Sequence, residues 1–214
     1  MSNFKFPYFS RDIGEFWRSW HISLSTWFRD YLYIPLGGSK GGKWISIRNI
    51  FIIFIVSGFW HGANWTFIMW GLIHAMLYIP LFLRGKNRQY TTSIVAEGKW
   101  FPSLRELFQM GSTFFFTMIA WVFFRSENIS LAFDYLFKMV SDFGMPSSNR
   151  QIIVYVLLIF TFEWVLKGDE RKILYFRKND FRYTSTIQFL IFFLIISLIT
   201  HHFSVQNNFI YFQF

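Results

Sequence analysis

The sequence predicts an all-α fold, a polytopic bundle of transmembrane helices that begins with an amphipathic helix at the membrane interface. Composition is the first reason: 53% of the 214 residues are hydrophobic, 24% are aromatic and only 15% are charged. Soluble domains average about 25% charged residues. The second reason is that several windows approach the roughly 20 apolar residues that a spanning helix needs. Cysteine is absent, which excludes disulfides and thiolate nucleophiles.

The net charge of +9 could by itself indicate a nucleic-acid-binding protein. However, the basic residues fall in short clusters between the apolar windows, as they do in the cytoplasmic loops of membrane proteins. We therefore expect membrane lipids, and no nucleic acid, as the surroundings of this chain.

Residues 1–43 form the first element, which is aromatic and too polar to span a membrane. Within it, EFWRSWHISLSTWFRDYLYIP places large apolar residues at helical spacing on one face, namely Trp17, Trp20, Leu24, Trp27 and Tyr31. Tryptophan and tyrosine are typical of the headgroup region. We expect an interfacial helix that ends near Pro35, where the flexible basic turn GGSKGGK follows.

Apolar segments make up the remaining elements, and together with the interfacial helix they indicate a single membrane domain, 1–214. The predicted spans are roughly 45–59, 64–83, 107–124, 151–166 and 187–203. The second and the last have convincing lengths. The first and the fourth are short, so they could be tilted, re-entrant or covered by neighbouring helices.

The charges of the connections predict an orientation. Segments 38–48, 84–106 and 167–186 are basic, whereas 125–150 is balanced and the tail after His202 is uncharged. The positive-inside rule places the basic connections in the cytoplasm, and 125–150 and the C-terminus outside. The turn at 60–64 then lies toward the outer side.

His61, in SGFWHG, is the first candidate catalytic residue because an ionisable group within the membrane is costly and marks functional sites. A neutral imidazole can take a proton from a hydroxyl and so activate it as a nucleophile. Trp60 and Trp65 could wall the site, Asn64 could bind a partner, and Gly62 leaves room for substrate. The alternative, a structural histidine that caps the turn, is about equally supported by the residues alone.

Other polar residues suggest weaker hypotheses. His21, in RSWHISLS, is the second candidate, although an interfacial histidine is the simpler interpretation. For His74 we favour an interhelical hydrogen bond, and for Arg29 and Asp30 a surface ion pair. HxxxH and HExxH are both absent, and His201 and His202 look interfacial, so no metal site is expected.

Four stretches resemble the membrane-bound O-acyltransferase family, and most closely its alginate O-acetyltransferase branch. They are PYFSRDIGEFWRSWHISLSTWFRDYLYIPLGG, SGFWHGANWTFIMWGLIHA, AWVFFRSENISLAFDYL and the terminal NNFIYFQF. The resemblance implies that His61 is the catalytic histidine and that His21 is the second polar residue of the site. It also implies a funnel through the bundle, where these residues meet both substrates.

The resemblance further implies the reactants. An acyl donor, such as acetyl-CoA or an acyl carrier thioester, enters from the cytoplasm, and no cofactor stays bound. The acceptor is an exported polysaccharide, or an extracellular partner protein that acetylates it, at the plasma or inner membrane. Because family members carry helices before PYFS, we expect the chain to correspond to the C-terminal part of a member. An inactive fragment or a membrane scaffold is the alternative function, and a polysaccharide transporter ranks last.

Overall fold

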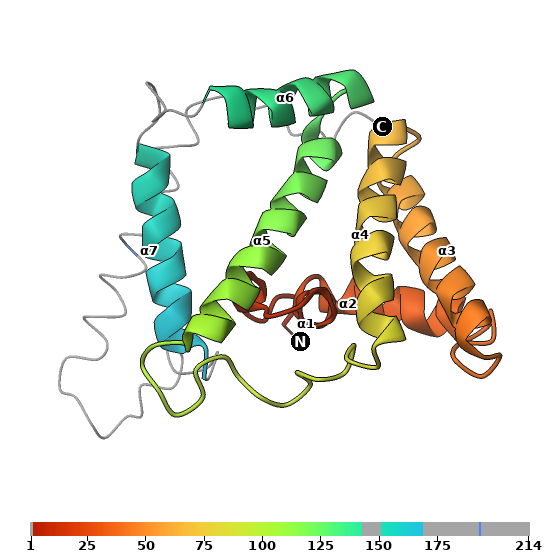
Figure 1. Cartoon of the computed structure of the whole chain (residues 1–214), viewed down its shortest axis with the longest axis horizontal. Coiled ribbons are helices and arrows are strands. Elements are labelled where there is room, and N and C mark those ends of the chain that lie inside the picture. The colour runs from red at the N-terminus through yellow and green to blue at the C-terminus, as the bar shows by residue number, and fades with distance from the viewer. Residues whose placement is uncertain (1, 143–150, 169–192, 194–214) are drawn as a thin grey trace. The chain divides into compact units, whose positions relative to one another are not determined.

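The computed structural model describes residues 2–142, 151–168 and Phe193, and every regular element in these ranges is a helix. The prediction of an all-α protein is confirmed. The elements, coloured along the chain in Figure 1, are η1 (Pro7–Phe9), α1 (Ile13–Ser19), α2 (Ile22–Phe28), η2 (Arg29–Tyr33), α3 (Lys43–His61), α4 (Trp65–Leu83), α5 (Leu104–Arg125), α6 (Ile129–Ser141) and α7 (Gln151–Leu166).

Three helices are long and apolar enough to cross a membrane: α3, α4 and α5. They contain the predicted spans 45–59, 64–83 and 107–124 almost residue for residue. The fourth prediction, 151–166, coincides with α7. The fifth, 187–203, falls outside the described residues apart from Phe193, as do the terminal signature NNFIYFQF, His201 and His202.

The aromatic N-terminal segment differs from its prediction because the expected single helix is broken after Ser19 into α1 and the consecutive elements α2 and η2. Helix α1 is capped by the carboxylate of Asp12, which accepts from Glu15 N at 2.7 Å. It stops at Ser19, where Trp20 turns to an extended conformation. His21 then adopts φ 44° and ψ 56°, the left-handed region that residues with a Cβ seldom enter. This break separates Trp17 from the face that Trp27 and Tyr31 occupy.

Helices α3 and α4 lie side by side, with α5 on the other side of α4 (Figure 1). Two glycines allow this close contact. A Cβ at Gly58 would come closer than 3.0 Å to Phe67 O, and one at Gly71 equally close to Phe54 O. Small residues of this kind are typical of helix interfaces in membranes, where backbones can approach each other.

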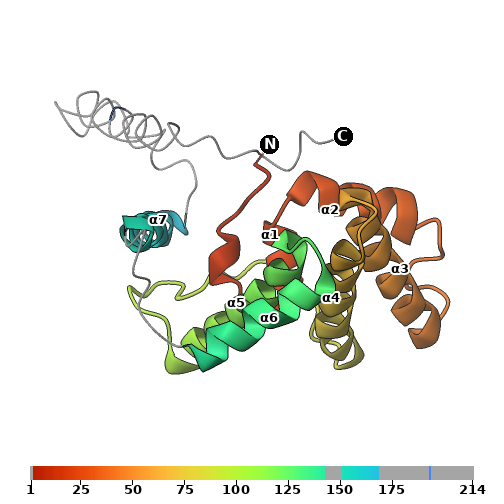
Figure 2. The same cartoon turned by 90° about the horizontal axis from the view of Figure 1, so that it is seen from above.

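Helix α6 runs across the C-terminal end of α5, which lies at the same end of the helices as the α3–α4 turn (Figures 1 and 2). Helix α1 packs against α4. At the opposite end of α4 and α5, the connection 84–103 is held to α1 by arginines. Arg18 donates to Asn87 O at 2.7 Å. Arg11, 6% exposed, binds Glu15 at 2.8 Å and Ser93 O at 2.7 Å. The N-terminal helices and this connection therefore enclose one end of the bundle.

Candidate active site

His61 is the last residue of α3, and the turn that follows is fixed at two points. Gly62 has φ 155°, and a Cβ there would lie 2.7 Å from Cε2 of Phe67. The Phe67 ring therefore occupies the space that Gly62 was expected to leave for a substrate. Asn64 caps α4 by accepting from Thr66 N at 3.1 Å, and it donates to Glu127 O at 2.8 Å. The turn is thus tied to the connection between α5 and α6.

The His61 imidazole lies among aromatic rings. Its centroid is 5.0 Å from Trp60, 5.3 Å from Trp70 and 4.9 Å from Phe124, in edge-to-face arrangements. Nδ1 is enclosed and has no hydrogen-bond partner in the part of the chain that the structure describes. Because Nδ1 is enclosed, Nε2 is the candidate nitrogen for proton transfer.

His21 lies near His61, close enough for the two imidazoles to interact electrostatically. It comes from the break between α1 and α2, and its ring is 6.0 Å from that of Phe4. Its Nδ1 is also enclosed without a partner among the described residues. Backbone strain of the kind found at His21 is typically concentrated at functional sites. The two candidate histidines therefore come from separate elements and lie within electrostatic range of each other.

The three residues predicted to shape the pocket occupy different positions. Trp60 stands beside His61 with 56% of its surface exposed, and Trp65 is 75% exposed. Asn64 uses both ends of its side-chain amide to hold the turn. Of the three, Trp60 alone has a ring contact with His61 among the described residues.

His74 is fully buried, and the interhelical hydrogen bond predicted for it is wrong. Neither ring nitrogen has a partner among the described residues. Instead, the imidazole stacks on Phe16 and Phe54 at 6.1 Å and meets Trp17 and Trp70 edge to face at 5.0 and 4.9 Å. It belongs to the aromatic packing between α1, α3 and α4.

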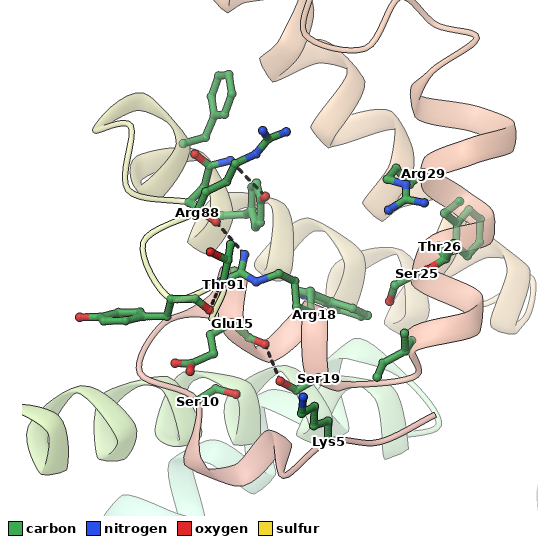
Figure 3. A pocket seen from close by; sticks show the side chains of 18 of the residues that line it. Lys5, Ser10, Glu15, Arg18, Ser19, Ser25, Thr26, Arg29, Arg88 and Thr91 are labelled. Carbon is green, nitrogen blue, oxygen red and sulfur yellow. Dashed lines mark hydrogen bonds between the residues drawn. The ribbon is translucent and has the colours of Figure 1, made fainter. Parts of the chain in front are cut away.

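A cavity of about 820 Å³ opens at the enclosed end of the bundle, between α1, α2, α3, the end of α4 and the connection 84–95 (Figure 3). Along α3 its lining runs from Ile50 to Ser57. Ser57 is one helical turn before His61, or about 6 Å along the helix axis at 1.5 Å per residue. The cavity therefore approaches His61 from the side of the basic connections.

The charges of this cavity are mostly positive. Arg18 and Arg88 come from one side and Arg29 from the other (Figure 3). Arg29 is paired with Asp30 at 2.7 Å, with both side chains exposed, which confirms the predicted surface ion pair. The hydrogen bond from Arg29 lowers the pKa of the Asp30 carboxyl. Glu15, the acidic residue of the lining, is held by Arg11.

Further basic side chains of the lining have no carboxylate within ion-pair distance in the described part of the chain: Lys5, Arg18, Arg88 and Lys167. An anionic ligand is therefore favoured over a neutral one. The sequence predicted a basic connection at 84–106, but it did not predict that α1 would face it across a cavity. Trp17 lines the cavity and Trp70 contacts His61, and neither contact was predicted, because at helical spacing both are indistinguishable from core residues.

Comparisons with known proteins identify a family and several relatives. Residues 3–85, which contain both histidines and most of the cavity lining, match the membrane-bound O-acyltransferase family model. The chain is 47% identical over 153 residues to the probable alginate O-acetylase of Pseudomonas syringae pv. tomato, covering 70% of this chain and 27% of that protein. It is 41% identical over 143 residues to the peptidoglycan O-acetyltransferase of Helicobacter pylori, covering 67% and 25%.

A more distant similarity is to the teichoic acid D-alanyltransferase of Bacillus subtilis, at 38% identity over 111 residues, covering 48% of this chain and 26% of that protein. The chain thus spans about a quarter of the length of the curated relatives it matches.

Proposed function

Because the chain belongs to the membrane-bound O-acyltransferase family, we propose that it is a membrane enzyme that transfers acetyl groups to hydroxyls of a cell-surface polysaccharide. One observation carries the proposal. His61 lies one helical turn beyond Ser57, which lines a basic cavity, and His21 is close enough to interact with it electrostatically.

The chemistry needs one base and one activated acyl group. His61 Nε2 takes the proton of the acceptor hydroxyl, and the oxygen attacks the thioester carbonyl. A C–O bond forms, the C–S bond breaks, and the departing thiolate takes the proton from His61. General base catalysis of this type contributes about 10²–10⁴ in rate. His21 orients the acceptor hydroxyl beside His61, and Trp60 closes one side of the site.

The acyl donor occupies the basic cavity. Acetyl-CoA and the phosphopantetheine arm of an acyl carrier protein both carry phosphate, which suits Arg18, Arg88 and Lys5 at the lining. Arginine is well matched to phosphate because its planar fork of donors can bind two oxygens at once. No resident cofactor takes part, since the donor is consumed in each turnover.

The acceptor comes from the other face of the bundle. The positive-inside rule supports an orientation in which the cavity faces the cytoplasmic side of the plasma or inner membrane and the His61 turn faces outward, with the C-terminus also outside. The hydroxyl belongs to an exported polysaccharide, or to an extracellular partner that passes the acetyl group on. The names of the relatives, alginate O-acetylase and peptidoglycan O-acetyltransferase, support this substrate class.

Gene deletion tests the proposal in the cell. Ester-linked acetate on surface polymers should fall in the deletion strain and return with the wild-type chain. It should not return with His61→Ala at the same membrane abundance. Restoration by His61→Ala would favour the alternative, a non-catalytic scaffold that assembles other components. Unchanged acetate after deletion would exclude both roles in this modification.

A further inference from the structure

Of the described helices with 13 or more residues, α6 separates apolar from polar side chains most strongly. At 3.6 residues per turn, its polar residues fall on one exposed arc: Ser130, Asp134, Lys138 and Ser141. Helices α3, α4 and α5 differ from it because apolar residues surround them, as is typical of helices that cross a membrane. A helix with two distinct faces is instead typical of the boundary between lipid and water.

The bundle covers only the middle of the apolar side of α6. Ala132 is fully buried there, and Ile129 and Leu136 pack with it against residues of α4 and α5. On both flanks of this line, large apolar side chains are exposed, with Phe137 at 72% and Val140 at 83% of their surface. One flank consists of Phe133, Phe137 and Val140, and the other of Leu131, Tyr135 and Met139. Exposed apolar surface of this extent marks an interaction site.

The placement of α6 decides what covers the two flanks. Helix α5, which is long and apolar enough to cross a membrane, ends at Arg125, and α6 then runs across this end (Figure 1). The buried line of α6 therefore faces the apolar bundle, and its polar arc faces away from it. A flat boundary between lipid and water touches both flanks at the same level, whereas a protein seated on one side covers a single flank. Lipid is therefore the favoured occupant.

We propose that α6 lies flat in the membrane interface, at the end of the bundle that carries the α3–α4 turn. Its two apolar flanks contact the upper parts of the lipid acyl chains, and its polar arc faces water. Asp134 and Lys138 carry opposite charges on that arc, so the contact does not need anionic lipid. The inference does not depend on the acyl transfer proposed above.

This contact also fixes the depth of the candidate site. Asn64, in the α3–α4 turn, donates to Glu127 O at 2.8 Å, and Asn128 caps α6 by accepting from Leu131 N at 2.9 Å. Helix α3 has 19 residues, and at 1.5 Å per residue it rises about 28 Å, close to the roughly 30 Å of a hydrocarbon core. The α6 contact thus holds His61, at the end of α3, near the boundary between lipid and water.

Single cysteines test the contact, because the chain has none of its own. The full chain is reconstituted in neutral phosphatidylcholine vesicles, and each introduced cysteine carries a fluorophore. Phe137→Cys and Val140→Cys report on one flank, and Tyr135→Cys and Met139→Cys report on the other. An interfacial helix inserts its apolar face about 5–10 Å. Lipids brominated near the top of the acyl chains should therefore quench all four labels several-fold more than aqueous iodide does.

Position 138 provides the matched control, since Lys138 lies on the polar arc of the same helix. A label at Lys138→Cys should be quenched by iodide and not by brominated lipid. Phe116 is exposed in the middle of α5, so it calibrates the depth. A label at Phe116→Cys should respond most to bromine placed deep in the acyl chains.

The outcomes decide between lipid, water and protein as the surroundings of α6. Quenching of both flanks by shallow bromine, with the polar arc open to iodide, supports the proposal. Labels on both flanks that iodide reaches freely would show that α6 stands in water, and would overturn it. Labels that neither quencher reaches would show that protein covers the flanks, and quenching of one flank alone would show that α6 does not lie flat. Either of these results also overturns the proposal.

Discussion

Replacing Gly71 by alanine tests whether close backbone contact between α3 and α4 holds the site together. The new Cβ would come closer than 3.0 Å to Phe54 O and lie 3.5 Å from Cα of Ile55. Because Phe54 O is a backbone atom, it cannot rotate away as a side chain would, and the helices must separate. Gly111 offers a matched control, since a Cβ at this position of α5 meets nothing within 4 Å.

The two variants undergo the same chemical change, so the gain in helix propensity, about 1 kcal/mol for glycine to alanine, is common to both. The difference between them is then the cost of overpacking, about 1–3 kcal/mol. Gly111→Ala should raise the free energy of unfolding by up to about 1 kcal/mol, and Gly71→Ala should lie below it by the overpacking cost. Since a misplacement of about 1 Å can cost roughly 10²-fold in rate, Gly71→Ala should also lose most activity.

The assay is the midpoint of thermal unfolding in detergent, measured together with acetyl transfer by membranes of equal protein content. We expect the Gly71→Ala midpoint to be lower than that of Gly111→Ala by roughly 2–4 °C for each kcal/mol. Equal midpoints and equal rates for the two variants would refute the tight helix contact and the role given to it.

Three further predictions concern other parts of the chain. The left-handed conformation of His21 costs about 1–2 kcal/mol for a residue with a Cβ. His21→Gly should therefore raise the midpoint of thermal unfolding, whereas His21→Ala should not, and acetyl transfer should be lost in His21→Gly. Equal losses of stability in the two variants would contradict this. Arg11→Gln leaves the Glu15 carboxylate without its ion-pair partner and Ser93 O without its donor, and should cost about 3–5 kcal/mol by thermal unfolding. Arg29→Gln at the exposed pair should not change the midpoint. Arg88→Gln should raise the KM for acetyl-CoA without lowering kcat. A change confined to kcat would show that Arg88 does not bind the donor.

The spans were predictable because membrane helices are long and uniformly apolar, so composition alone identifies them. Helices α3, α4 and α5 follow the predicted segments closely. For Asn64 the sequence predicted only that the side chain could bind a partner, and not that it caps α4 through Thr66 N. The second contact of Asn64, with Glu127 O, was not predictable, because it joins residues 63 positions apart in the chain.

Features that depend on tertiary packing escaped sequence reasoning. Helical periodicity runs through His21, yet the backbone breaks there. At the break, Ser19 O accepts from Lys5 N and Ile22 N donates to Asn3 O. Gly62 appeared to leave space for a substrate, but Phe67 occupies that space. His74 was predicted to hydrogen-bond across helices, and aromatic rings enclose it instead. In each case the local structure depends on contacts that the residue types alone do not specify.

The role of His61 is tested most directly by the initial rate of acetyl transfer from labelled acetyl-CoA to surface polysaccharide. The rate is measured for wild-type and His61→Gln chains at equal abundance in the same membranes. Glutamine retains polar character and helix propensity but cannot take a proton at working pH, so the rate should fall by about 10²–10⁴. A His61→Gln rate equal to that of the wild type would contradict the central role of this imidazole.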